Sequence, residues 1–307
     1  MEINKKRYRD VDSYFKRKFN KKIIKIPLDG GFTCPNRDGK ISKLGCIYCS
    51  ENGAGDFTKY DNLDKQIDYQ IKRLKNPKRK EGYMAYFQNF TSTYGDFEKI
   101  KKLFYKAINN QNIMGLSIAT RADCLSDEVI DLLDDLNKKT FLIVELGLQS
   151  VNEKSIEFIN RGYSHKEFDK GLLKLKEKNI KCLAHLIIGL PNEDLDDYLR
   201  AISYINKREF WAIKIHNLYI EKGSRIYDYY LENQNEFTMT LDEFVDYVIL
   251  ILENLNPNII VQRLTGDGRR DRIIWPIWSK NKAKVLSTID KKLKERNKNQ
   301  GDLWKEK

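Results

Sequence analysis

The sequence contains no apolar run long enough to cross a membrane. A membrane-spanning helix needs about 20 consecutive apolar residues, and the longest apolar stretch, residues 244–255, is interrupted by Asp246, Glu253 and Asn254. Met1 leads directly into charged residues, so a secretory leader is not expected. We therefore expect a cytoplasmic protein with no membrane partner, in which cysteine thiols stay reduced and can bind metal.

Cysteine and histidine are scarce, because the 307 residues include five cysteines and three histidines. An odd cysteine count argues against a framework of disulfides. Three of the five nevertheless fall within sixteen residues, at Cys34, Cys46 and Cys49, and the last two have the spacing C-x-x-C. Three thiolates on one loop can bind three irons of a [4Fe–4S] cluster and leave the fourth iron open to a substrate or cofactor.

Zinc binding and inert thiols are the alternatives for the same loop. A closed structural zinc site has four ligands, commonly as two short pairs, and the other cysteines and histidines form no second pair near the loop. Those other residues are Cys124, Cys182, His165, His185 and His216. The open cluster is the favoured interpretation and zinc the second, while Cys124 and Cys182 are most simply small core residues.

The net charge of +12 is concentrated at the two ends of the chain. Residues 1–25 carry +7 and residues 280–307 carry +6, so the part between them is nearly neutral. Two basic ends around a neutral body are typical of a protein that binds a polyanion such as nucleic acid. The alternative is that the lysine-rich ends only solvate the protein.

Apolar segments that end in polar or glycine residues alternate with amphipathic helices along the chain. This alternation predicts a parallel sheet, and six such units predict an α/β fold of the partial (β/α)6, TIM-like barrel type, with its site at the carboxyl ends of the strands. The expected strands are residues 23–26, 82–90, 115–119, 141–148, 182–188 and 212–216. A basic helix at about 7–19 precedes them, and a helix at 242–255 and a strand at 258–261 form an appended element. We expect one domain over residues 1–279 and a basic helix or tail over 280–307.

The cysteine loop resembles that of the radical S-adenosylmethionine (SAM) enzymes. The similarity lies in Gly30–Gly39 (GGFTCPNRDG) and Gly45–Cys49 (GCIYC), which give the pattern C-x11-C-x2-C with the aromatic Tyr48 before the last cysteine. The first gap is longer than in C-x3-C-x2-C, the commonest pattern of the superfamily. It resembles that of the YhcC/YtqA-type subgroup, which is akin to the radical SAM domain of the Elongator catalytic subunit. The similarity extends over about residues 5–275.

This resemblance implies two cofactors and an electron donor. Cys34, Cys46 and Cys49 would hold a [4Fe–4S] cluster, and SAM would bind at its open iron and be cleaved to methionine and a 5′-deoxyadenosyl radical. The electron would come from a protein such as flavodoxin or ferredoxin. The radical would then remove a hydrogen atom from an unreactive C–H bond of the substrate.

The resemblance also assigns SAM contacts to residues at successive strand ends. Four residues after the second expected strand take the place of the family's motif for the methionine amino group, although the usual Gly-Gly-Glu is absent; they are Gln88, Asn89, Thr91 and Ser92. Arg121 would hold the SAM carboxylate. The remaining implied SAM-binding residues lie on the cysteine loop and at the ends of the fourth and fifth expected strands. They are Tyr48, Glu145, Gln149, Ser150, His185, Gly189 and Leu190.

Each of these candidates also has a structural interpretation. The residues after the second strand could form an ordinary polar turn. Arg121 could pair with Asp123 or Glu145, and Glu145, placed among apolar neighbours, is costly unless it is paired or hydrogen-bonded. A lone histidine such as His185 is more often structural than catalytic.

The resemblance implies tRNA as the partner, with removal of the carboxymethyl group from a 5-carboxymethylaminomethyl side chain on the wobble uridine to leave 5-aminomethyl. The basic ends agree with an RNA partner, because phosphate contacts supply most sequence-independent affinity. Contacts to tRNA phosphate or to the substrate carboxylate are expected from Arg263, Arg269, Arg270 and Arg272. Trp275 and Trp278 could stack on an anticodon base, but we favour their anchoring the tail.

Two other functions are compatible with the sequence. The first is a radical SAM enzyme that acts on a small molecule or a protein. The second is a zinc-stabilised RNA-binding module without enzymatic activity. The absence of a second cysteine cluster argues against sulfur insertion of the methylthiotransferase kind.

Overall fold

The computed structural model describes residues 6–50, 53, 58 and 61–306, which form two compact units. The cysteine-loop unit comprises the described residues of 12–147 and 161–183, and the C-terminal unit comprises 6–11, 148–160 and 184–306. Strands β4 (Phe141–Gln149) and β5 (Lys181–Ile188) each begin in the cysteine-loop unit and end in the C-terminal unit.

The cysteine-loop unit is built on a parallel sheet. Strands β1 (Lys22–Leu28), β2 (Glu81–Phe87), β3 (Ile113–Thr120) and β4 pair in that order. Almost every residue of β2 is buried, as expected for a strand that is covered on both faces of the sheet. The register places Leu28 beside Phe87 and Thr120 beside Leu146. The carboxyl ends of the strands therefore form one edge, from which the cysteine loop and the loops after β2 and β3 all leave.

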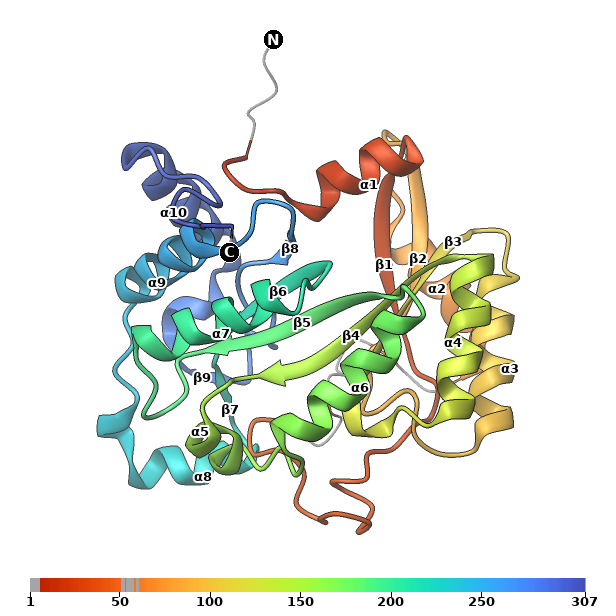
Figure 1. Cartoon of the computed structure of the whole chain (residues 1–307), viewed down its shortest axis with the longest axis horizontal. Coiled ribbons are helices and arrows are strands. Elements are labelled where there is room, and N and C mark those ends of the chain that lie inside the picture. The colour runs from red at the N-terminus through yellow and green to blue at the C-terminus, as the bar shows by residue number, and fades with distance from the viewer. Residues whose placement is uncertain (1–5, 51–52, 54–57, 59–60, 307) are drawn as a thin grey trace. The chain divides into compact units, whose positions relative to one another are not determined.

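Helices α2 (Leu63–Leu74), α3 (Phe97–Ile108) and α4 (Asp127–Lys139) follow these strands in the chain, and α3 contacts both α2 and α4 (Figure 1). Each begins at a side chain that accepts a hydrogen bond from the first turn, namely Asn62, Asp96 or Ser126. The buried residues of α3 recur at helical spacing and face the sheet. The unit also contains the short helix η1 (Ala122–Cys124) and α6 (His165–Glu177).

Helix α1 (Val11–Phe19) lies at the opposite edge of this sheet from the cysteine loop. The rings of Phe15 and Phe19 lie 5.8 and 5.5 Å from the ring of Phe141, which is the first residue of β4. The ammonium of Lys18 lies 5.3 Å from the same ring. The basic N-terminal helix is therefore anchored at the amino ends of the strands.

In the C-terminal unit, β6 (Ala212–Asn217) pairs in parallel with β8 (Ile260–Arg263). Helix α9 (Leu241–Asn254) buries much of its surface because α7 (Leu195–Lys207) and α10 (Lys282–Glu295) both pack against it (Figure 1). The remaining elements of this unit are α5 (Glu153–Phe158), α8 (Arg225–Glu232), the short helices η2 (Gln234–Glu236) and η3 (Ile277–Lys280), and an antiparallel pair of β7 (Ile220–Glu221) with β9 (Ile273–Trp275).

All six strands predicted from the sequence are present, and hydrogen bonding between neighbours follows the order β1-β2-β3-β4-β5-β6-β8. The predicted appended strand is β8, which extends this sheet as its seventh strand. The first helix starts at Val11 and not at residue 7, because the chain bends at residues 7–8 and Asp10 forms a β-bridge with Val261. The predicted boundary at residue 279 stays a prediction. None of the helices in the described ranges combines the length and the apolar character needed to cross a membrane.

Candidate functional site

The cysteine loop folds back on itself through its own backbone. The amide of Arg37 donates to the carbonyl of Cys34 at 2.8 Å, and the amide of Gly45 donates to the carbonyl of Asn36 at 2.6 Å. The Arg37 guanidinium then donates to the carbonyls of Cys49 and Ser50, at 3.3 and 2.5 Å. Arg37 thus ties the two ends of the cysteine-bearing segment together.

Gly45 makes this arrangement possible. Its φ of +71° lies in the left-handed region, and a Cβ at this position would lie 2.8 Å from Nε of Arg37. A side chain there would push against the guanidinium that closes the loop.

Donor groups around the Cys46 sulfur favour its thiolate form. The amide nitrogen of the buried Asn36 side chain lies 3.6 Å from Sγ of Cys46. The pKa of Cys46 is lowered to about 6, chiefly by a hydrogen bond from the Cys49 thiol and further by the charge of Arg121. The same hydrogen bond and burial raise the pKa of Cys49. Since the thiolate is the form that binds metal, Cys46 in particular is suited to metal ligation.

The positions of the cysteines do not match a mononuclear metal site. Within the described ranges, no three side chains from histidine, cysteine, aspartate and glutamate converge so as to hold a single metal ion. The three cysteines of an open [4Fe–4S] cluster bind three different irons, so they need not converge on one point. Amide and guanidinium groups beside the sulfurs suit the negative charge of a thiolate-bound cluster. The residues present therefore fit an iron–sulfur cluster better than zinc.

The other two cysteines have different surroundings. Cys182 is buried, and Sγ of Cys124 lies 3.8 Å from Oδ1 of Asp123. Burial raises the pKa of both thiols to about 12, so they stay protonated. This agrees with the interpretation of Cys182 as a core residue, whereas Cys124 is only half-buried.

The loop after β2 holds two buried oxygens that lack a hydrogen-bond partner among the described residues. These are Oδ1 of Asn89 and Oγ1 of Thr91, whose residues are 3% and 1% exposed. The amide of Thr91 donates to the carbonyl of Thr33, directly before the first cysteine, at 3.1 Å. Between them Phe90 has a φ of +54°, which is a strained conformation for a bulky residue.

The other polar side-chain groups of this loop include two that have hydrogen-bond partners. The side-chain nitrogen of Asn89 donates to Oγ1 of Thr58 at 2.8 Å, and Oγ of Ser92 donates to the carbonyl of Phe87 at 3.2 Å. Gln88 is half-buried. The unpaired oxygens therefore belong to Asn89 and Thr91 alone within the predicted group.

Tyr48 and Arg121 lie close to the cysteines, but Arg121 is held by protein groups. Its Nε and one terminal nitrogen donate to the two carboxylate oxygens of Asp123, at 2.9 and 2.8 Å, and the other terminal nitrogen donates to the carbonyl of Arg161 at 2.8 Å. Its guanidinium also lies 4.6 Å from the ring of Tyr163. Burial, together with the nearby Cys46 and Cys49 sulfurs, raises the pKa of the Tyr48 phenol. Arg121 thus takes the structural pairing that the sequence left open.

Glu145 is likewise held inside the sheet of the cysteine-loop unit. One carboxylate oxygen accepts from Lys25 and, at 2.6 Å, from Oγ of Ser117; the other accepts from the Tyr86 hydroxyl at 3.1 Å. The four residues come from four neighbouring strands and form the barrel network, the name used below for this set. The structure therefore favours an ion pair over a ribose contact for Glu145.

The other predicted cofactor residues lie in the C-terminal unit. Gln149 has a φ of +65° at the end of β4, and the Ser150 hydroxyl donates to Glu193, whose pKa is raised to about 7 by burial. The rings of His185 and His216 lie 5.7 Å apart. After β5, Gly189 has a φ of +96° and its amide donates to the Tyr198 hydroxyl, and Leu190 is buried. The role of each in cofactor binding stays a prediction.

Of the four predicted RNA-binding arginines, two lie beside aspartates of their own loop and two are exposed. Arg263 lies 3.6 Å from Asp267, and Arg269 lies 2.7 Å from Asp271. Arg270 and Arg272 are exposed. Two of the four charges are therefore partly neutralised within their own loop.

The two tryptophans next to these arginines are packed into the unit. The Trp278 indole donates to the carbonyl of Met239 at 3.1 Å and its ring lies 5.0 Å from Phe244. The ring of Trp275 lies 5.4 Å from that of Phe237. This favours anchoring over base stacking.

Sequence analysis did not identify several residues that shape this site. Asn36 and Arg37 lie between Cys34 and Cys46 in the sequence, and this position alone could have indicated that they contact the cysteines. Lys25, Ser117 and Tyr86 could not be linked to Glu145 without the strand register.

Comparison with known proteins gives consistent results. A family model described as the radical SAM superfamily matches residues 38–205, and one described as the radical SAM C-terminal domain matches residues 210–295. The chain is 40% identical to the uncharacterized protein YtqA of Bacillus subtilis, over 97% of this chain and 93% of that protein. It is 30% identical to protein YhcC of Escherichia coli, over 91% of this chain and 90% of that protein.

Two more distant similarities are informative. The chain is 25% identical to the tRNA-2-methylthio-N(6)-dimethylallyladenosine synthase of Aquifex aeolicus, over 54% of this chain and 38% of that protein. Among solved structures, archaeal Elp3 from Methanocaldococcus infernus is similar with a TM-score of 0.64 and 15% identity, over 91% of this chain and 64% of that chain. The predicted α/β fold class of the partial-barrel type is thereby confirmed.

Proposed function

Because the chain belongs to the radical SAM superfamily, in its YhcC/YtqA-type subgroup, we propose that Cys34, Cys46 and Cys49 hold the [4Fe–4S] cluster that this family uses together with SAM. The observation that carries the proposal is the closed cysteine loop, in which Asn36 and Arg37 donate to a sulfur and to the adjoining backbone. When bound, the reduced cluster and SAM supply an organic radical that can remove a hydrogen atom from an unreactive C–H bond.

We propose that Asn89 and Thr91 bind the ammonium group of SAM. An ammonium is a donor with no acceptor, and both residues present a buried oxygen that the described protein leaves unsatisfied. A buried polar atom without a partner costs about 1–3 kcal/mol, so a ligand that fills this need would bind with a corresponding gain. Gln88 and Ser92 then shape the loop around the two oxygens.

Arg121 and Glu145 have positioning roles in this proposal. Arg121, held by Asp123, places a positive charge that favours the thiolate of Cys46. Glu145 keeps Lys25 neutralised inside the sheet. Neither needs to touch SAM to support the site.

We propose an RNA substrate, in agreement with the similarity to a tRNA-modifying synthase. The reaction proposed is the removal of the carboxymethyl group from a 5-carboxymethylaminomethyl side chain of the tRNA wobble uridine. We further propose a cytosolic setting and a flavodoxin- or ferredoxin-type electron donor. A radical SAM enzyme acting on a small molecule or a protein is the second candidate, because the similarity to the synthase covers only about half of this chain.

The test uses anaerobically purified protein with a reconstituted cluster, supplied with SAM and dithionite. The reaction is run with and without tRNA from a strain that lacks this gene, and 5′-deoxyadenosine and the wobble nucleosides are measured. We expect deoxyadenosine and a changed wobble uridine, both lost in Cys46→Ala. Deoxyadenosine without a changed nucleoside would keep the radical enzyme and remove the RNA substrate. Absence of iron and of SAM cleavage would refute the whole proposal.

A further inference from the structure

Helix α1, which carries part of the basic N-terminal end, is poorly placed to bring RNA to the cysteine loop. Helix α1 is anchored at the amino ends of the strands, where Phe15 and Phe19 pack on Phe141. The cysteine loop leaves from the carboxyl ends of the same sheet. Within the cysteine-loop unit, the charges of α1 therefore lie at the edge opposite to the cysteines.

The charges of the C-terminal helix are largely neutralised within their own unit. Lys292 lies 2.8 and 3.2 Å from Asp242 and Asp246 of α9, and Arg296 lies 2.8 Å from Asp246. Further pairs of this kind are Lys294 with Asp290, Lys298 with Glu253 and Lys282 with Asp267. A cation that already has a carboxylate partner gains less from a phosphate, because the existing pair must be given up.

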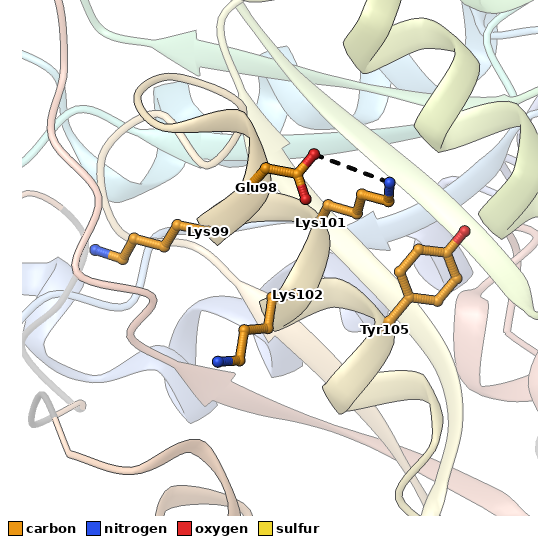
Figure 2. Close-up of a pocket in the computed structure, with 5 residues that line it drawn as sticks. All are labelled: Glu98, Lys99, Lys101, Lys102 and Tyr105. Atoms are coloured by element: carbon orange, nitrogen blue, oxygen red, sulfur yellow. Dashed lines mark ion pairs between the residues drawn. The ribbon is translucent and has the colours of Figure 1, made fainter.

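A different group of lysines lies at the cysteine edge. The first two turns of α3 present Lys99, Lys101 and Lys102, which with Glu98 and Tyr105 line a hollow of about 600 Å³ (Figure 2). The one acid of this hollow is 3.9 Å from Lys101, which is a loose pair. Lys102 forms no ion pair or hydrogen bond with any residue in the described ranges.

This lysine group is joined to the cysteine loop. The ammonium of Lys99 donates to the carbonyl of Gly31, three residues before the first cysteine, at 2.9 Å. The ammonium of Lys40, on the loop itself, lies 5.3 Å from the ring of Tyr94, and Tyr94 comes two residues before Asp96, the cap of α3. The cysteine loop and the start of α3 are thus joined by a lysine from each.

The tip of the cysteine loop is ordered and exposed. The Ile41 amide donates to the Pro35 carbonyl at 2.8 Å, so the tip is held in place by its own backbone. Ile41 and Leu44 are 44% and 59% exposed, and the lysines beside them, Lys40 and Lys43, are exposed as well. Apolar side chains set between cations suit a partner that combines charge with flat apolar faces, as nucleotides do.

We propose that Lys40, Lys43, Lys99, Lys101 and Lys102, here called the lysine rim, bind the phosphate backbone of the RNA substrate beside the cluster. The inference rests on the proposed function, since it concerns where that RNA docks. All five lysines are exposed, and exposed cations that contact phosphate release counterions, which supplies the sequence-independent part of RNA affinity. An acidic electron-donor protein is the competing occupant, and the test separates it from RNA.

The test compares two triple variants of the full, cluster-loaded chain. The rim variant carries Lys99→Gln, Lys101→Gln and Lys102→Gln; the control carries Lys16→Gln, Arg17→Gln and Lys21→Gln, which remove the same charge from exposed positions at the opposite edge. Binding of tRNA from the strain lacking this gene is measured by fluorescence anisotropy at several salt concentrations. The iron content of each preparation verifies that the cluster is loaded.

We expect the rim variant to bind the tRNA about 10- to 100-fold more weakly near 0.1 M salt, with a salt dependence reduced by about two charges. The control should change by less than about threefold. An equal loss in both variants, or unchanged RNA affinity in the rim variant, would overturn the proposal. Normal RNA affinity with slower reduction by a flavodoxin would assign the rim to the electron donor instead. Failure of the proposed function is distinct, because it would appear as a wild-type protein that does not cleave SAM.

Discussion

At the carboxyl end of β2, Asn89 and Thr91 hold buried oxygens that the described residues leave unsatisfied, whereas deeper in the same sheet Lys25, Tyr86, Ser117 and Glu145 satisfy one another. Both groups are polar and part of the cysteine-loop unit, and all their members are buried except Lys25, which is half-buried. A protein that gains only stability from a buried polar group pairs it internally. The comparison therefore separates a structural group, the barrel network, from a group that is ready for a ligand.

The strongest test of this contrast is Glu145→Gln. Removing the charge leaves Lys25 inside the sheet with a neutral partner, which we expect to lower the free energy of unfolding by about 2–4 kcal/mol. The measurement is urea unfolding with far-ultraviolet circular dichroism. SAM affinity of the cluster-loaded protein, measured by equilibrium dialysis, should change little.

The double variant Lys25→Met, Glu145→Leu is the control for this prediction. It removes both charges, and we expect it to regain part of the stability because no buried charge is left unpaired. Unchanged stability in Glu145→Gln together with a loss of SAM binding would show that Glu145 contacts the cofactor after all.

In the C-terminal unit, Glu193 is hydrogen-bonded to Ser150, as in an internally paired group, but burial still disfavours its charged form. Burial raises the pKa of Glu193 to about 7, above its unfolded value of about 4.3. Between these values the folded state binds the proton more tightly than the unfolded state, so stability falls as pH rises. We expect a loss of about 2 kcal/mol between pH 5.5 and 7.5, measured by urea unfolding.

Glu193→Gln should remove this dependence, because an amide does not titrate in that range. Asp242→Asn is a suitable comparison, since the pKa of this exposed aspartate is lowered by Lys292 and the group stays ionised throughout the interval. A Glu193→Gln protein that loses stability as steeply as the parent would contradict this prediction.

Thr91→Val tests the group that we propose is ready for a ligand, Asn89 and Thr91. The substitution removes the unsatisfied hydroxyl at nearly constant volume, so we expect stability to stay the same or to rise by about 1 kcal/mol. SAM should bind about tenfold more weakly to the cluster-loaded protein, as judged by equilibrium dialysis. Ser117→Ala, in the barrel network, should show the reverse pattern of lower stability and unaltered SAM affinity. Lower stability in Thr91→Val with normal SAM binding would remove Thr91 from the proposed site.

The order of strands and helices could be predicted from the sequence, because apolar periodicity is a local signal; the C-x-x-C spacing is a local signal of the same kind, and the three cysteine ligands that it indicates stay a prediction. The sequence was not sufficient for Arg121 and Glu145, where a charged residue at a strand could equally serve a cofactor or an ion pair. The choice depended on Asp123 two residues away and on Lys25, which lies 120 residues earlier in the chain. The same limit applies to the basic C-terminal end, whose net charge is evident from the sequence although its carboxylate partners on α9 are not.

Gly45→Ala is expected to have the smallest effect and probes the closure of the cysteine loop. An alanine at a φ of +71° costs about 1 kcal/mol, and its Cβ would also press on Nε of Arg37. Gly223→Ala carries comparable backbone strain at a φ of +87° but meets no atom within 4 Å. We expect similar small losses of stability in both variants, whereas iron retained after desalting should fall only in Gly45→Ala. Equal iron retention would show that the Arg37 contact is not needed to hold the loop for the cluster.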